Sequence, residues 1–461
     1  MRNYNFQFAQ AYQGQWNIPS IGEGIPGTLY IEKHVMHLDL FWNKYASARI
    51  GKHKNATGYA YAKDDKNKTG YYFTLNDLFC TYVSSFGDQQ SQFKFEVANF
   101  TITDNPNLVV NEIKSFCIRT QLMDKWVSNL TQRCFEYDYP FETNKIKLKY
   151  KALKPLTVYK TTDIHVYIYF GHGETYPSFQ GYNMTTRAFL NVELKEPVSF
   201  DKAFDLSEHT TWLLSLLWNN MFCPDFVEYR TPKDKTQFIY KQSDRYSYKY
   251  TDWVSTNVTT ELTDFPDNKL SSIIGKWIEF ADHEIEPLNT FFETLYNEHM
   301  PPLSVIKNFI STIDGLSADL RGETKGQITK GKHKKDIDDI LIKVENGLNK
   351  IGLNKNEFYK LKTTALRESN KTLKERFSCL LRNIEKYVEC DLEQDFCEKA
   401  IKTRNYYTHL KDKNEIMYSK KQFWDLSQCL EKIITAFILN KIGVESKTAQ
   451  IIVRKITMKE E

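Results

Sequence analysis

The residues best suited to chemistry form the stretch Arg-Asn-Tyr-Tyr-Thr-His, which ends at His409 within a predicted helix over 393–411. Asn405 and His409 are four residues apart, so they share one face of that helix, with Thr408 beside them. Arg404 lies to the side of that face, and its long side chain reaches the phosphate of an RNA substrate bound there. Histidine transfers protons near neutral pH, and arginine offers a planar, charged set of donors. Together they supply what attack of a ribose 2′-hydroxyl on its neighbouring phosphate requires, without a metal ion.

The spacing alone is not specific, because an exposed Arg and His are common at a helix end. The surrounding residues are more informative. Residues 401–410, IKTRNYYTHL, resemble the (V/I)-x-x-RN-x-x-TH stretch of HEPN-domain proteins, in particular the ApeA-like HEPN proteins of bacterial anti-phage defence. The resemblance is strongest over 393–443 and extends more loosely over 270–461. The first half is similar to the ApeA N-terminal domain in its length and in its opening, 27–40, and offers no motif that matches residue by residue.

The resemblance implies an all-α domain that dimerises and an RNA endonuclease whose catalytic residues are Arg404 and His409. Asn405 and Thr408 are then expected to orient the histidine or the scissile phosphate. Asp314 lies where related domains often place an acidic residue near the active centre. A carboxylate on a helix surface is an equally good interpretation of Asp314, and the sequence leaves both open.

The composition is that of a soluble protein with more than one core. At 461 residues the chain exceeds a single ordinary domain, so two or three are expected. The net charge of +4 is too small to indicate nucleic-acid binding by itself. The N-terminus lacks the basic and apolar parts of a signal peptide, and the longest apolar runs, 213–218 and 433–439, are too short to span a bilayer. We therefore expect a cytoplasmic protein without membrane contact.

Patterns for metal or cofactor binding are weak throughout. The eight cysteines form no Cys-x-x-Cys pair, which favours reduced core thiols. His34 and His37 are three apart on a predicted strand and point to opposite faces. His165 and His172 have no nearby cysteine or paired carboxylates in the sequence, as a zinc site would need. No glycine-rich phosphate loop is present. We predict neither a metal nor a cofactor.

Hydrophobic periodicity divides the chain into two halves. The predicted fold class is α+β: a β-rich antiparallel N-terminal domain, 1–262, with a sensing or regulatory role, followed by an all-α HEPN helical bundle, 263–461. Alternating residues predict strands of a sandwich or a barrel-like sheet, with one helix over 200–221 and a polar boundary over 251–267. The strands are expected near 29–31, 38–40, 71–73, 93–97, 146–150, 164–170, 226–229 and 237–241.

The second half follows a helical period. Helices are expected near 270–299, 303–320, 336–350, 356–388, 393–411, 419–442 and 445–456. Pro287 should kink or split the first of them. The basic stretch over 321–335 has two interpretations: a solvated flexible loop, or a mobile arm that grips RNA phosphates.

The sequence thus predicts a metal-independent endoribonuclease of anti-phage, abortive-infection defence. Its substrate would be single-stranded or loop RNA, with an exposed tRNA loop as the leading candidate. We expect a homodimer or a higher assembly of such dimers, and a phage-derived trigger sensed by the N-terminal domain. Tyr406, Phe423 and Trp424 either line the shared interface or are buried within one bundle. The alternative is a HEPN module that binds RNA or a partner without catalysis, beside an N-terminal domain that recognises a phage component.

Overall fold

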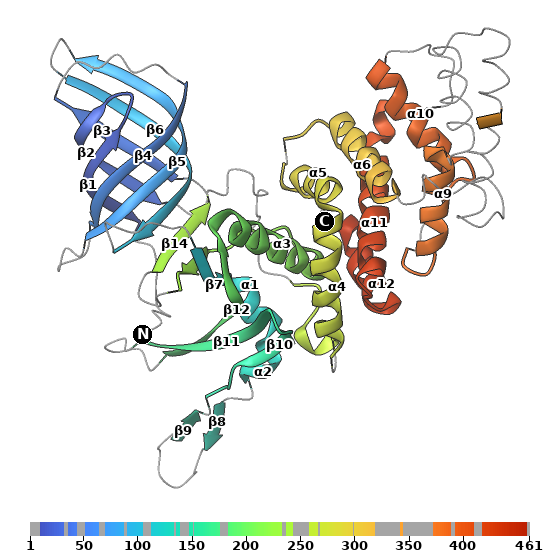
Figure 1. The fold of residues 1–461 in the computed structure, drawn as a ribbon, viewed down its shortest axis with the longest axis horizontal. Helices are drawn as coiled ribbons and strands as arrows, with labels where there is room; N and C mark the ends of the chain where they lie inside the picture. The colour runs from blue at the N-terminus through green and yellow to red at the C-terminus, as the bar shows by residue number, and fades with distance from the viewer. Residues whose placement is uncertain are drawn as a thin grey trace. The chain divides into compact units, whose positions relative to one another are not determined.

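The computed structural model forms two compact units (Figure 1). The first comprises Met1–Ile278 with Tyr296–Glu298, and the second comprises Glu279–Leu295 with His299–Glu461. The division falls within helix α4 (Lys269–His283), on the C-terminal side of the expected boundary between 262 and 263. The structure describes residues 10–31, 36–43, 51–63, 70–86, 90–104, 112–132, 135–138, 147–150, 152–175, 183–232, 237–242, 258–265, 268–297, 299–318, 342–343, 372–388, 392–409 and 417–458.

The first unit is built on antiparallel strands. These are β1 (Ala11–Ile18), β2 (Gly22–Ile31), β3 (Met36–Trp42), β4 (Gly51–Ala62), β5 (Gly70–Phe86), β6 (Gln90–Thr103), β7 (Glu112–Arg119), β8 (Phe135–Asp138), β9 (Lys147–Tyr150), β10 (Leu156–Lys160), β11 (Ile164–Thr175), β12 (Asn183–Ser199), β13 (Phe226–Arg230) and β14 (Gln237–Gln242). Its short helices are α1 (Gln121–Trp126), α2 (Ser128–Gln132) and η3 (Leu262–Asp264).

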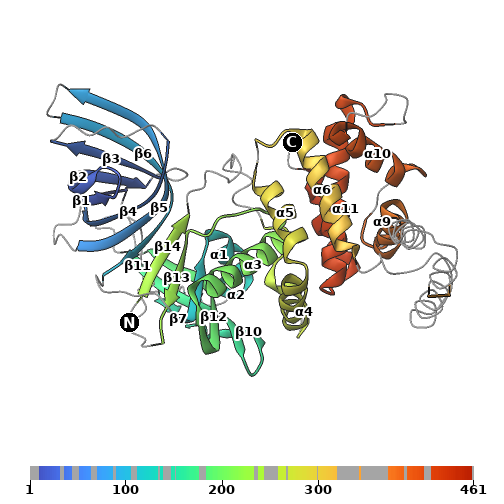
Figure 2. The ribbon, with the colours of Figure 1, turned by 45° about the horizontal axis from the view of Figure 1, so that its top comes forward.

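Strands β1 to β6 close on themselves. Each strand pairs antiparallel with two neighbours in the cyclic order β1, β2, β3, β6, β5, β4 and back to β1 (Figure 2). Alternate side chains point inward, and the ring is filled by apolar groups such as Trp16, Phe73, Phe93 and Phe100. The alternating pattern of the sequence follows from this filled interior.

A glycine sets how closely two of these strands approach. A Cβ atom on Gly14 would lie 2.2 Å from the carbonyl oxygen of Tyr59 on the neighbouring strand. Real Cβ atoms do not come so close to backbone, so only glycine fits here without moving β1 away from β4.

In the described part of the chain, six further strands extend this sheet, while β8 and β9 pair with each other in a separate two-stranded sheet. Strand β14 pairs with β6, and the order then continues through β13, β7, β12 and β11 to β10. Helix α3 (Phe200–Trp218) packs on β7 and β12. Ser199 caps its start, and Asn219, with a φ of 48°, ends it. This helix confirms the prediction over 200–221, and the sheet confirms the β-rich antiparallel half.

The second unit is helical, as predicted. Its elements are α5 (Ile285–Tyr296), α6 (Pro302–Leu316), α9 (Leu373–Ile384), α10 (Phe396–His409), η5 (Lys420–Gln422), α11 (Phe423–Lys441), α12 (Ser446–Arg454) and η6 (Lys455–Met458). Helix α11 is the centre of the packing, because it contacts α6, α9 and α12 (Figure 1). Its buried face includes Leu430, Ile433, Ile434 and Phe437.

Several boundaries differ from the sequence prediction. The helix expected over 270–299 is two helices, and the break lies at Glu284, with Pro287 inside the first turn of α5, where a proline is tolerated. Helix α10 begins at Phe396 rather than at residue 393. His34, the basic stretch 321–335 and most of the helix expected over 336–350 lie outside the described residues. Of the helix expected over 356–388, residues 356–371 also lie outside them, and the described remainder contains α9. No helix in the described ranges is long and apolar enough to cross a membrane.

Candidate functional site

Helix α10 presents one face to the core of the helical unit and another to its surface. The buried face carries Phe396, Ala400 and Thr403, which follow one another at helical spacing. The Thr403 hydroxyl donates to the Lys399 carbonyl at 2.7 Å and accepts from the Tyr418 backbone N–H at 3.0 Å. The helix is thereby held to the segment that leads into α11, and its last two turns carry the predicted site.

Arg404 and Asn405 are in direct contact. The Arg404 Nη1 donates to the Asn405 Oδ1 at 3.1 Å, and both side chains are half-buried. A guanidinium has five N–H donors, so this single bond orients the group and leaves donors for an anion. The structure thus places Asn405 against the arginine, and its expected role in orienting the histidine or the phosphate stays a prediction.

The Thr408 hydroxyl is engaged within its own helix. It donates to the Arg404 carbonyl at 2.7 Å, the contact that a threonine makes with the residue four positions earlier. The hydroxyl oxygen keeps its acceptor lone pairs on an exposed side chain. His409 is the last residue of α10, and its side chain lies outside the described part of the chain. Its expected role in proton transfer stays a prediction.

Lys307 is a residue at this site that sequence reasoning missed. It comes from α6, and its Nζ donates to the Tyr407 carbonyl at 3.2 Å. The last carbonyls of a helix have no partner within the helix, and a cation is favoured at that end. Lys307 thus pins the turn that carries Thr408 and His409, and it adds a positive charge there. No signal in the sequence connects two residues 100 positions apart.

Aromatic rings connect α10 to the start of α11. The Tyr407 ring meets Tyr406 at 4.8 Å and Phe423 at 5.3 Å between centroids, both edge to face. Phe423 is buried within the unit, whereas Trp424 is 49% exposed. Of the aromatic residues considered for a shared interface, Phe423 therefore has its partners within the chain.

Asp314 has a partner that explains it structurally. Its Oδ1 accepts from the Arg376 Nη2 at 2.5 Å, and the Arg376 Nη1 also donates to the Asp314 carbonyl and the Ser317 hydroxyl. The arginine side chain is only 6% exposed. The carboxylate joins α6 to α9, which favours a structural role for Asp314 over a catalytic one.

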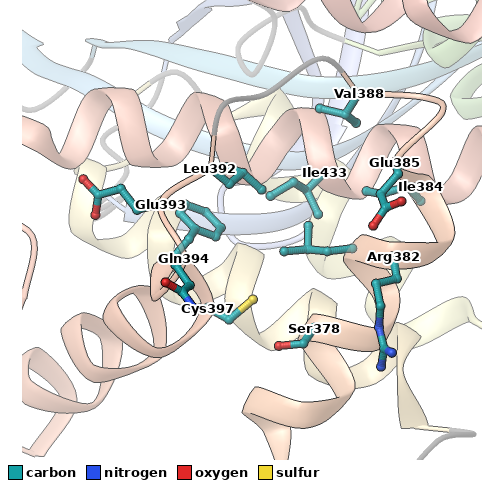
Figure 3. Close-up of a pocket in the computed structure, with 12 residues that line it drawn as sticks. Ser378, Arg382, Ile384, Glu385, Val388, Leu392, Glu393, Gln394, Cys397 and Ile433 are labelled. Carbon is teal, nitrogen blue, oxygen red and sulfur yellow. The ribbon is translucent and has the colours of Figure 1, made fainter.

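A cavity of about 380 Å³ lies at the other end of α10 (Figure 3). Ile384, Phe396 and Ile433 form its apolar wall, and Arg382 and Cys397 line it as well. Burial raises the pKa of the Cys397 thiol, so the thiolate is disfavoured. None of the predicted site residues lines the cavity. It is separate from the end of the helix where Arg404 lies.

The described residues of the first unit offer a second polar cluster. His165 contacts the Thr157 hydroxyl at 3.0 Å through Nε2, and its Nδ1 lies 3.8 Å from the Glu193 carboxylate. These are neighbours on paired strands of the sheet surface. No group of three or more His, Cys, Asp or Glu side chains with metal-binding geometry occurs within the described ranges.

Two family models match the chain. ApeA N-terminal domain 1 matches residues 11–277, and Apea-like HEPN matches residues 308–448. The first match alone covers more than half of the sequence. The chain belongs to the ApeA-like HEPN family. Among curated proteins and among solved structures, no match was found.

Membership of this family has a direct consequence for the site. HEPN domains are generally nucleases, and the ApeA-like family supports a module of anti-phage defence. The HEPN match includes all of α10 and all of α11. Lys307 lies one residue before the match begins, so its contact with Tyr407 comes from the structure and not from the family match.

Proposed function

We propose that this protein is an endoribonuclease of anti-phage, abortive-infection defence that cuts RNA at the C-terminal end of α10. The observation that carries the proposal is the geometry of that helix end. Arg404 is oriented by Asn405, and the following turn, which ends in His409, is held by Lys307 from α6. An arginine that can bind a phosphate and a histidine that can carry a proton thus occupy adjacent turns of one helix.

The proposed reaction is an internal displacement at phosphorus. The ribose 2′-oxygen forms a bond to phosphorus as the bond to the leaving 5′-oxygen breaks. His409 takes the proton of the 2′-hydroxyl or supplies one to the 5′-oxygen. Arg404 stabilises the charge that gathers on the phosphate oxygens. The products are a 2′,3′-cyclic phosphate and a 5′-hydroxyl, and no step in this scheme requires a metal ion.

The substrate we infer is single-stranded or loop RNA, with an exposed tRNA loop as the leading candidate. The major groove of A-form RNA is deep and narrow, so an arginine and a histidine carried on a helix cannot read the bases there. An unpaired loop allows the 2′-hydroxyl to align with the bond that breaks, and it exposes its phosphate to the arginine.

The proposed active form is a homodimer or a higher assembly of such dimers. One chain supplies one His409, whereas the reaction uses both a base and an acid. A two-fold axis beside α10 would bring the second His409 and Arg404 to the same cleft, and isologous dimers are the commonest oligomers. We further propose that the β-rich unit restrains the nuclease and senses a phage-derived trigger.

Cleavage assays with matched variants test the nuclease. Arg404→Ala and His409→Ala should each reduce cleavage by about 100-fold or more, since each removes a group that acts in the transition state. Lys402→Ala is the matched control. It also removes a cation from α10, but this lysine pairs with Glu398 at 3.1 Å. Cleavage by His409→Ala at the wild-type rate would refute the assignment.

Two further measurements test the chemistry. Sequencing of the RNA ends should find a 2′,3′-cyclic phosphate and a 5′-hydroxyl, and cleavage should persist in EDTA. An oligonucleotide with deoxyribose just 5′ of the cut should resist. Equal cutting of that substitute would exclude attack by the 2′-hydroxyl.

A further inference from the structure

The first turn of α11 exposes an indole ring to solvent. Trp424 is 49% exposed, although Phe423 before it and Leu426 after it are buried. Among the described residues of the helical unit, the other large apolar side chains with comparable exposure are Ile342 and Ile451. A single exposed tryptophan is not in itself a site, so its surroundings decide what it does.

Two lysines precede the indole on a well-defined turn. Lys420 and Lys421 lie four and three residues before Trp424, spacings that bring side chains to the same side of a helical turn. A capping box fixes this turn, because both the backbone N–H and the hydroxyl of Ser419 donate to the Gln422 Oε1, at 3.0 and 2.9 Å. Both lysines are exposed, and within the described part of the chain neither has a carboxylate partner.

One ring contact links this turn to the helix of the candidate site. The ring of Phe423, next to Trp424, packs against Tyr407 at 5.3 Å. Tyr407 is in the last turn of α10, and its carbonyl accepts from Lys307. Through the contact between Phe423 and Tyr407, the turn that holds Lys420, Lys421 and Trp424 is packed against the last turns of α10, which carry Arg404.

We propose that Trp424, Lys420 and Lys421 form a stacking platform for the RNA strand, on which an unpaired base lies against the indole while the lysines contact neighbouring phosphates. The proposal rests on the proposed function for its choice of ligand. An exposed aromatic ring beside cations is the combination that single-stranded nucleic acid recognises, because every base has a face that stacks and every nucleotide has a charge. A paired duplex offers no free base face.

A second copy of the chain is the other occupant that an exposed tryptophan invites. The neighbours of Trp424 argue against it, since Lys420, Lys421, Gln422 and Asp425 are all exposed and polar. The centres of protein interfaces are depleted of lysine and aspartate. The positive charges of Lys420 and Lys421 instead complement a phosphate backbone.

Binding to an oligonucleotide that cannot be cut tests the platform. The full chain is titrated into a fluorescein-labelled 2′-O-methyl RNA 12-mer, whose blocked 2′-oxygens cannot attack the phosphate. Trp424→Ala should weaken binding by about 5- to 150-fold, the range for loss of one stacked base, while Trp424→Phe should retain most of the affinity. Ile451→Ala on α12 is the matched control, since that side chain is 50% exposed and should leave binding unchanged.

The salt dependence of the same titration tests the lysines. A Lys420→Ala, Lys421→Ala double variant should reduce the slope of log affinity against log salt by about 1.4, since each phosphate contact on a single strand contributes about 0.7. Wild-type affinity in Trp424→Ala overturns the platform, as does a wild-type chain that does not bind the 12-mer. So does a change of oligomeric state in light scattering with unchanged RNA binding, which would assign Trp424 to a protein interface.

The two proposals fail in different ways. If the chain binds the 12-mer through Trp424 but does not cut unmodified RNA, the platform stands and the nuclease falls. If the chain cuts RNA but Trp424→Ala binds the 12-mer normally, the nuclease stands and the platform falls.

Discussion

Removing the Asp314 carboxylate should destabilise the contact between α6 and α9 more than removing its arginine partner. The two side chains are unequally buried: Arg376 is 6% exposed and Asp314 is 31% exposed. Asp314→Ala leaves a buried guanidinium without its counter-charge. Arg376→Met fills the same space with an apolar chain and returns the carboxylate to water. The asymmetry of burial therefore predicts the order of the two effects.

The magnitudes follow from the contacts that each variant retains. Breaking a buried ion pair by removing one partner costs about 3–5 kcal/mol. In Asp314→Ala the Arg376 Nη1 keeps its bonds to the Asp314 carbonyl and to Ser317, so we expect the lower end, about 3 kcal/mol. Arg376→Met removes the hydrogen bonds of the guanidinium but leaves no unpaired charge buried, so we expect a loss of stability of about 1–2 kcal/mol.

Hydrogen exchange measures the loss of stability locally, at the amides of α9. A local measurement is needed because a chain of two units does not unfold in one step. A loss of about 3 kcal/mol should speed amide exchange in α9 by roughly 150-fold in Asp314→Ala. Lys374→Met is the control on the same helix, because it breaks the exposed Lys374–Glu398 pair and should leave exchange unchanged. If Asp314→Ala exchanges like the wild type yet no longer cuts RNA, the carboxylate acts in the chemistry and our structural interpretation is wrong.

Three further predictions concern the site helix, the sheet and the assembly. Lys307→Met should reduce cleavage by about tenfold, since a charge-assisted hydrogen bond contributes about 1.5 kcal/mol. Lys307→Arg should retain most activity, and equal cleavage rates for Lys307→Met and the wild type would show that Lys307 does not support the site. Gly14→Val should destabilise the first unit by about 3 kcal/mol or more in thermal unfolding, because the added Cβ would lie 2.2 Å from the Tyr59 carbonyl oxygen. Gly24→Ala is the control: a Cβ there has nothing within 4 Å, and its φ of +66° should cost only about 1 kcal/mol. Similar losses of stability for both variants would refute the steric argument. Light scattering should find dimers or assemblies of dimers, and a monomer with full activity would exclude the composite cleft.

Local pattern determined the parts of this protein that depend on a few neighbouring residues. Alternation predicted strands such as β3 and β11, and a 3.6-residue period predicted α6, α10 and α11, because both periods reflect which side of an element is buried. Helical spacing also predicted that Arg404, Asn405 and His409 lie in the last turns of α10, and the described helix ends at His409. The break was predicted at Pro287 but lies at Glu284, because a proline in the first turn of a helix does not interrupt it.

Tertiary structure alone decided what lies next to those elements. Alternating apolar residues show that one face of a strand is buried, but they do not show that β4 pairs with β1 and so closes the ring of strands. Neighbouring aromatic residues in the sequence look equivalent, yet packing against Tyr407 buries Phe423 and leaves Trp424 in solvent. Lys307 joins the end of α10, and Arg376 takes up Asp314, through contacts between residues far apart in the chain. Such contacts depend on how whole helices pack, and no local pattern of residues encodes them.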